Sequence, residues 1–309
     1  MAVDKNLFRK ITEYFEEKSE LVDSSSFAVY ALIRNDSLAC FYQNREITGE
    51  EPRRFEITLE NMLGYLETRK RNMEDLERYA KECASKLYEV GAENIDVEKA
   101  YLMTNGSSLP LRVDLTIENK EGRINKTMYI KCFDPTRLLG IELYRLIGET
   151  DRRYWFFFNE GIIVEDSQEG EHEFESTERI SEREHYKEER IKADLISFYL
   201  GLDDLGKKDN YLVASDGKIR IIDFDMMNRV YSDKDIIAIK RQSAEEIGIS
   251  SEEYDTRYKE EERLLRERVH RKKDRIYQII GILKSSEDSG IAAIGNYISK
   301  NTENLLSKH

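Results

Sequence analysis

The sequence is poor in the residues that build disulfide-bonded or metal-bound scaffolds. It has three cysteines, four histidines and three prolines among 309 residues. Cys40, Cys83 and Cys132 are far apart and odd in number, a pattern that fits neither a disulfide framework nor a zinc site. We therefore expect reduced thiols and a cytoplasmic location.

Long apolar runs and an excess of positive charge are missing as well. No run reaches the ~20 apolar residues that a membrane-spanning helix requires, and the residues after Met1 do not form a signal peptide. The net charge is −13, which argues against general nucleic-acid binding, because such binding uses Lys and Arg to neutralise phosphates. We therefore expect neither a membrane nor a nucleic-acid partner.

Polar side chains are concentrated in the segment 204–210, and an acidic pair follows it. Asn210 supplies a carbonyl oxygen. Asp223, which lies 13 residues after Asn210, and Asp225 supply carboxylates. These are the hard oxygen ligands that Mg²⁺ prefers. Lys207 could offset the negative charge that develops on a transferred phosphoryl group. The layout is typical of a site that holds magnesium and the phosphates of ATP.

The chain between these two groups predicts a short hairpin. The apolar stretch 211–213, the Ser-Asp-Gly turn at 215–217 and the stretch 218–222 follow one another as strand, turn and strand. Such a hairpin would bring Asn210 and Asp223 to the same end of two strands. The alternative is a surface hairpin with acidic ends, because Asp, Asn and Gly are ordinary turn residues.

Both segments resemble loops of the protein-kinase-like fold. Its catalytic loop reads Asp-Leu-Lys-x-x-Asn and, after a hairpin, its metal-binding loop reads Asp-Phe-Gly. The segment 204–210 fits with one residue inserted, so that Lys207 matches the loop lysine and Asp204 lies one place early. Leu202-Asp203 stands where the family has His-Arg. Asp225 replaces the glycine of the metal-binding loop, a variation similar to that of small-molecule and atypical branches such as aminoglycoside phosphotransferases.

The resemblance implies a role for each of these side chains. Asp204 would accept the proton of the substrate hydroxyl, with Lys207 beside it as the second catalytic residue. Asn210, Asp223 and Asp225 would hold Mg²⁺.

The stretch upstream follows the order of the family's small lobe. Alternating apolar residues predict strands at 96–104 and 111–118, joined by a turn at 105–108. The resemblance places the backbone of Gly106 and Ser107 over the ATP phosphates. A plain hairpin turn is the alternative.

The next predicted strand, 127–133, carries a lysine between two aromatic residues. Met128 and Ile130 lie on one face, and Lys131 lies on the other. In the family, a lysine of the third strand contacts the α- and β-phosphates of ATP and pairs with a helix glutamate, and Lys131 matches that position. An edge-strand lysine that extends past aromatic rings is the alternative.

An Asp-Pro pair opens a predicted helix at 135–147. Glu142 lies inside its apolar stripe, where a carboxylate needs a partner. Lys131 is the candidate partner. Glu149 is the other glutamate that could pair with Lys131 in place of Glu142. An ordinary helical pair between Glu142 and Arg145 is the alternative.

Two apolar strands at 154–158 and 161–164 complete the predicted small lobe. A polar connector at 165–170 follows, beginning with Glu165. The resemblance makes this connector the hinge to the large lobe, and its backbone would hydrogen-bond to adenine.

Helical spacing dominates the rest of the chain. It predicts a helix at 182–200, before the catalytic loop, and an apolar face from Leu265 to Leu283 on a later helix. Basic residues gather on the other faces of that later helix, between Arg266 and Arg275. Such a run is usually a solvated face, and the alternative is a docking surface for an acidic substrate or a nucleic acid.

The first 95 residues match no motif. They predict a helix at 6–21, a hairpin formed by 27–33 and 38–42, and a long helix that ends at Gly91. This extension could cover the small lobe, regulate the protein or bind a substrate.

The predicted fold class is therefore α+β, with a bilobal protein-kinase-like fold. An extension at 1–95 precedes a small antiparallel-sheet lobe at 96–165 and a mainly helical lobe at 166–309. The predicted function is ATP- and Mg²⁺-dependent transfer of the γ-phosphoryl group to a hydroxyl of a protein or a small molecule. The alternatives are an ATP-binding pseudokinase or regulatory module, and a kinase-fold transferase of AMP.

Overall fold

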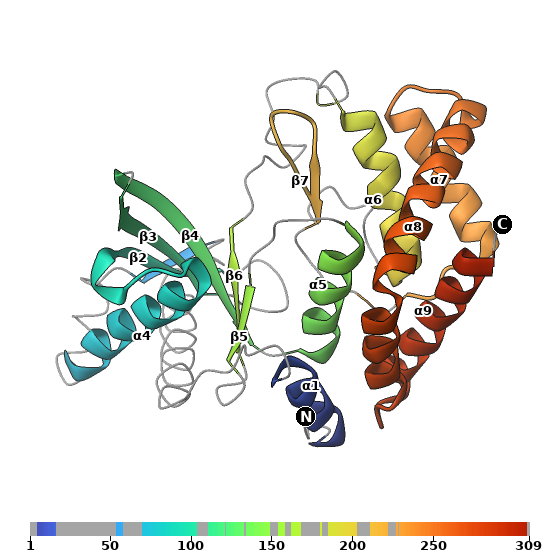
Figure 1. Ribbon diagram of the computed structural model, residues 1–309. Coiled ribbons are helices and arrows are strands. Elements are labelled where there is room, and N and C mark those ends of the chain that lie inside the picture. The colour runs from blue at the N-terminus through green and yellow to red at the C-terminus, as the bar shows by residue number, and fades with distance from the viewer. Residues whose placement is uncertain are drawn as a thin grey trace, which may run out of the picture. The chain divides into compact units, whose positions relative to one another are not determined.

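The protein is an α+β molecule with an antiparallel sheet and mainly helical content (Figure 1). The computed structural model describes residues 5–16, 54–57, 70–103, 111–120, 122–132, 134–148, 154–157, 162–167, 180, 185–202, 211–221, 227 and 229–307. The chain divides into two compact units. The helical unit comprises Met1–Tyr14, Asp134–Asp151 and Gln168–His309, and the sheet unit comprises Phe15–Phe133 and Arg152–Ser167.

The sheet unit is built on six antiparallel strands in the order β1-β2-β3-β4-β6-β5. The strands are β1 (Arg54–Ile57), β2 (Ile95–Met103), β3 (Leu111–Asn119), β4 (Gly122–Cys132), β5 (Tyr154–Phe157) and β6 (Ile162–Asp166). Strand β1, which pairs with β2, was not predicted. The predicted strands at 96–104, 111–118, 154–158 and 161–164 correspond to β2, β3, β5 and β6 with shifts of one or two residues at their ends.

Strand β4 begins five residues earlier than the alternation predicted. Asn119 pairs with Gly122, so two residues connect β3 to β4, and Gly122 has a φ of +123° that favours glycine. This tight connection fixes the register and pairs Arg123–Thr127 with β3. The side chain of Ile124 in this stretch is 40% exposed, which explains why apolar alternation did not mark it as strand.

Helix α4 (Lys70–Tyr88) covers the sheet, with contacts to β2, β5 and β6 (Figure 1). Ala80, Cys83, Ala84 and Leu87 are buried and recur at helical spacing, which confirms the predicted helix. A short 3₁₀ helix at Ala92–Asn94 connects it to β2. The predicted hairpin at 27–42 lies outside the described residues.

The helical unit is organised around one long helix. Its elements are α1 (Lys5–Glu16, which belongs to this unit as far as Tyr14), α5 (Pro135–Gly148), α6 (Tyr186–Leu200), the strands β7 (Tyr211–Val213) and β8 (Ile219–Ile221), α7 (Asp233–Glu246), α8 (Ser251–Lys284) and α9 (Ser289–Ser307). Helix α8 packs against α5, α6, α7 and α9. Its predicted apolar face from Leu265 to Leu283 is buried.

Helix α5 begins where the Asp-Pro pair predicted. The Asp134 carboxylate accepts the backbone N–H of Arg137 at 2.8 Å, and Pro135 is the first helical residue. The helix contacts α6 and α8, and it is grouped with the helical unit. From the sequence, we expected this helix to lie with the strands of the small lobe.

Candidate functional site

The predicted hairpin between the two loops is present as β7 and β8. Tyr211 pairs with Ile221, Leu212 with Arg220 and Val213 with Ile219. Asn210 directly precedes Tyr211, and Asp223 follows Ile221 by two residues. The paired ends of β7 and β8 therefore continue into the two loops that carry the predicted site.

A second pairing holds the other ends of the same loops. Leu202 forms an antiparallel bridge with Met227, the N–H of Arg229 donates to the carbonyl of Gly201 at 3.0 Å, and the hydroxyl of Tyr231 donates to the carbonyl of Leu202. The residues that flank the segments 203–210 and 222–226 therefore pair with each other at both ends: Leu202 with Met227, and Tyr211 with Ile221. Both segments lie outside the described residues, and they contain the predicted catalytic and metal residues Asp204, Lys207, Asn210, Asp223 and Asp225.

Gly201 is needed where the first loop leaves helix α6. Its φ is +70°, and a Cβ at this position would lie 2.4 Å from the carbonyl oxygen of Arg229. Left-handed backbone at the end of a helix favours glycine. In this case the close approach of the neighbouring chain excludes a larger residue as well.

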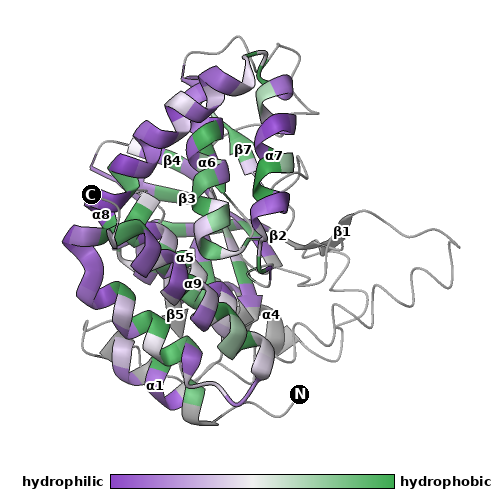
Figure 2. Ribbon diagram, turned by 90° about the vertical axis from the view of Figure 1, so that its right-hand side faces the viewer, coloured by the Kyte–Doolittle hydropathy of each residue, from purple (hydrophilic) through white to green (hydrophobic). Residues whose placement is uncertain are grey.

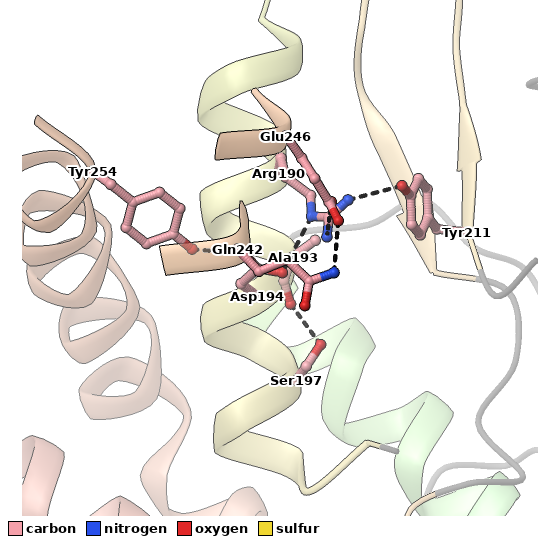
Figure 3. Close-up of polar contacts among 8 residues, drawn as sticks. All are labelled: Arg190, Ala193, Asp194, Ser197, Tyr211, Gln242, Glu246 and Tyr254. Atoms are coloured by element: carbon pink, nitrogen blue, oxygen red, sulfur yellow. Dashed lines mark hydrogen bonds and ion pairs between the residues drawn. The ribbon is translucent and has the colours of Figure 1, made fainter. Parts of the chain in front are cut away.

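A buried polar network fixes the start of β7 (Figure 3). Arg190 of α6 donates to the hydroxyl of Tyr211 at 2.9 Å and forms ion pairs with Asp194 at 3.3 Å and Glu246 of α7 at 3.1 Å. The hydroxyl of Tyr254 in α8 donates to Asp194 at 2.6 Å. One arginine thus connects α6, α7 and β7, and Asp194 extends the connection to α8.

The environment of this network keeps Arg190 charged and Tyr254 protonated. Burial by itself lowers the pKa of Arg190, but the acidic groups around it, Asp194 first and then Tyr211, Tyr186 and Glu246, together outweigh burial and raise that pKa above its usual value. Burial, followed by the negative charge of Asp194, raises the pKa of Tyr254 far above 10.0. Tyr254 therefore remains a hydrogen-bond donor at neutral pH, and Tyr211 stays anchored beside Asn210.

In the sheet unit, Lys131 pairs with a buried glutamate. Its Nζ lies 3.4 Å from Oε2 of Glu165, and the two side chains are 12% and 2% exposed. Tyr129 is the register partner of Glu165, so the two charged residues are diagonal neighbours on adjacent strands. As predicted, Met128 and Ile130 are buried on the opposite face of β4.

The start of the polar connector was predicted wrongly. Glu165 and Asp166 belong to β6, and the carboxylate of Asp166 accepts the hydroxyl of Tyr88 at 2.8 Å. From the sequence, we expected only a backbone role for Glu165, because a run of polar residues begins there. The structure shows a buried carboxylate with a cationic partner.

Glu142 is fully buried in α5, as its place in the apolar stripe predicted. Arg145 donates to it at 2.8 Å and 3.1 Å, Arg275 of α8 at 2.9 Å, and the hydroxyl of Tyr14 at 3.3 Å. The alternative pair with Arg145 is confirmed, and the partners Arg275 and Tyr14 were not predicted. Lys131 and Glu142 belong to different units, so their pairing stays a prediction.

The remaining predicted residues, Gly106, Ser107 and Glu149, lie outside the described residues. In the part of the chain that the structure describes, no group of His, Cys, Asp or Glu side chains is arranged to hold a metal ion. None of the described helices is long and apolar enough to cross a membrane.

Comparisons with known proteins leave the family open. No model of a known protein family matches the chain, and neither does any curated protein.

Proposed function

We propose that this protein is an ATP- and Mg²⁺-dependent phosphotransferase with a bilobal protein-kinase-like fold. The observation that carries the proposal is the pair of chain contacts Leu202–Met227 and Tyr211–Ile221. They bound the segments 203–210 and 222–226 at both ends. A catalytic loop and a metal-binding loop that act on one ligand need this kind of juxtaposition.

The donor set in these segments fits a magnesium–nucleotide complex. Asn210, Asp223 and Asp225 offer oxygen atoms alone, the donors that Mg²⁺ prefers. Bound Mg·ATP would supply the phosphoryl group. Asp204 would accept the proton of the acceptor hydroxyl, and Lys207 would stabilise charge on the transferred group.

The order of elements along the chain also supports the proposal. Three antiparallel strands, β2 to β4, are followed by α5 and then by β5 and β6, the succession that the resemblance implies. Lys131, in the third of these strands, would hold the α- and β-phosphates. The backbone of Gly106 and Ser107 would cover the phosphates, and the backbone at Glu165 would contact adenine.

Two other functions use the same nucleotide site. A pseudokinase or regulatory module would bind ATP without transfer, and the leucine at position 205, five residues before Asn210, favours this function because the family has its base there. A nucleotidyl transferase would bind ATP in a flipped pose and transfer AMP. The acceptor is a protein hydroxyl or a small alcohol, and the Asp-Phe-Asp form of 223–225 favours a small molecule or an atypical protein substrate.

The products formed from ATP separate these functions. Purified protein is incubated with Mg·ATP and followed by ³¹P NMR and by intact-mass analysis. ADP formation, or a phosphate added to the protein, supports the phosphotransferase, whereas AMP and pyrophosphate, or an added nucleotide, support the nucleotidyl transferase. Saturable ATP binding with no turnover, in the presence of a panel of alcohols and proteins, supports the pseudokinase.

A further inference from the structure

The longest helix carries its charges in two blocks. Residues 251–262 of α8 include six acidic and two basic residues, and residues 266–275 include six Lys or Arg and two acidic residues. Most of the α8 ribbon is hydrophilic in Figure 2. In a chain with a net charge of −13, the second block is a local positive region. Arg275 of this block points to Glu142, while Arg271, Lys272 and Lys273 are exposed.

A pocket lies in this positive region. It has a volume of about 380 Å³ and is lined by Arg266, Glu267, His270, Arg271 and Leu306. This is within the size range of ligand pockets, roughly 300–1,000 Å³. The four lining residues of α8 form two pairs four apart, so they share one helix face.

The helical hairpin of α8 and α9 explains how Leu306 reaches the pocket. Glu267 is 17 residues from the last residue of α8, Lys284, and Leu306 is 17 residues from the first residue of α9, Ser289. The two helices pack together, and equal spans from one turn bring their residues to the same level. Leu306, which is partly exposed, adds an apolar wall to a basic pocket.

The lining carries two cationic side chains, Arg266 and Arg271, and one anionic side chain, Glu267. The carboxylate of Glu267 forms an ion pair with Arg263, which also binds Glu260. Arg266 and Arg271 are the cationic lining residues, and the ring of His270 adds nitrogen atoms that can donate hydrogen bonds. Guanidinium groups match the geometry of phosphate oxygens.

From this combination we infer a second ligand site, in which Arg266, Arg271 and His270 bind the phosphate of a small phosphate ester and Leu306 contacts its apolar part. The site lies within the helical unit and uses none of the residues of the proposed nucleotide site. Its existence does not depend on the proposed function.

The test measures binding of phenyl phosphate, with methyl phosphate and inorganic phosphate as separate ligands. Isothermal titration calorimetry on the wild-type protein should give saturable binding of phenyl phosphate, with a dissociation constant below about 1 mM. Methyl phosphate and inorganic phosphate should bind more weakly, because they lack the apolar group. The double substitution R266Q/R271Q should weaken binding about tenfold or more, because it removes the charge-assisted contacts while keeping good helix formers.

The matched control is K272Q/K273Q, which removes the same charge from the same helix at positions that do not line the pocket. It should change binding less than about threefold, since these lysines act only through the long-range field. An equal loss in both double variants, or no saturable binding to the wild type, would overturn the inference. Circular dichroism checks that both variants keep their helix content.

The position of the ligand is read from histidine signals. Phenyl phosphate should shift the ring-proton NMR signals of His270 and leave those of the exposed His185 unchanged. The variant Asp223→Asn should bind phenyl phosphate like the wild type, which separates this site from the proposed nucleotide site. Shifts confined to other histidines, or loss of binding in Asp223→Asn, would contradict the assignment.

Discussion

At the scale of single residues, the pair Lys131–Glu165 links the stability of the sheet to the proposed site. Glu165 is almost fully buried, and a buried carboxylate that loses its cationic partner is strongly unfavourable. A lysine that served only as a surface charge would not need such a partner. The pair would therefore hold the ammonium group in position before a phosphate arrives.

Substitution of Lys131 by Met should lower the free energy of unfolding by about 3 kcal/mol, because the charge of Glu165 is left buried. Adding Glu165→Gln should recover at least half of this loss, since the double variant has no buried charge to compensate. Urea denaturation measures both effects. Neither variant should bind ATP.

The control is Lys120→Met in the exposed turn between β3 and β4, which should change stability by less than about 0.5 kcal/mol. If the double variant were no more stable than Lys131→Met, Glu165 would not depend on Lys131. If the double variant bound ATP like the wild type, Lys131 would have no role in phosphate binding.

At the scale of elements, the candidate site depends on contacts that hold two chain segments side by side at both ends of the loops. Gly201 and Arg229 approach each other at one end of the loops, and Arg190 holds Tyr211 at the other. Arg190 lies in α6 and Tyr211 in β7, whereas Gly201 directly follows α6 and Arg229 precedes α7.

Gly201→Ala should destabilise the protein by about 2 kcal/mol or more, because the new methyl group meets the Arg229 carbonyl and the backbone is left-handed. The matched control is Gly281→Ala, inside α8. Apart from the helix's own backbone, no heavy atom of the described residues lies within 4 Å of the place that this methyl group would take. The control should stabilise the protein by up to about 1 kcal/mol, because alanine favours helix.

Thermal unfolding of both variants checks these opposite signs. Surface substitutions usually change stability by less than about 0.5 kcal/mol. A loss no larger than this in Gly201→Ala would contradict the close approach of Gly201 to the Arg229 carbonyl.

Elements were predictable from the sequence where burial follows a regular period. Ile191 and Leu195 in α6, and Leu265 to Leu283 in α8, were placed correctly, because one buried face repeats with the helical turn. The start of β4 was not placed correctly, because the side chains of its first residues are exposed. The hairpin at 211–221 was predictable, since a Ser-Asp-Gly turn separates two apolar runs.

Polar contacts between distant residues were not predictable. Arg275 and Glu142 are 133 positions apart, and Arg190 and Tyr211 are 21 apart. Neither pair leaves a periodic signature, because only the folded chain brings α5 to α8 and α6 to β7. The sequence could show that Glu142 needs a partner, but not that α8 supplies one.

At the scale of the whole molecule, buried tyrosines limit the pH range of the fold. Among the tyrosines that the structure describes, burial is the largest cause that raises the pKa of these five above 10.0: Tyr14, Tyr199, Tyr254, Tyr258 and Tyr297. A group with a raised pKa in the folded state stabilises the fold fully below its unfolded pKa. That contribution is lost as the pH rises above about 10, where the unfolded chain releases the proton first.

We therefore expect alkaline unfolding above about pH 10 in which part of the phenol ionisation accompanies loss of helix. Absorbance near 295 nm follows phenolate formation, and far-UV circular dichroism follows the helices, in a titration from about pH 8 to 12. The exposed tyrosines should ionise first with no loss of helix. Ionisation of all tyrosines near pH 10 in a protein that keeps its helical signal would contradict the burial of these five.

The central claim is that residues 203–210 and 222–226 form one magnesium–nucleotide site. Calorimetry of ATP binding, with and without Mg²⁺, tests it on the wild type, on Asp223→Asn and on the control Asp216→Asn. Asp216 is exposed in the turn of the same hairpin, where it pairs with Lys218 at 3.1 Å, so its substitution removes the same charge from the far end of β7 and β8. We predict that ATP binds the wild type and Asp216→Asn only with Mg²⁺, and that Asp223→Asn weakens this binding about tenfold or more. Absence of binding to the wild type, or equal Mg²⁺-dependent binding to Asp223→Asn, would contradict the account.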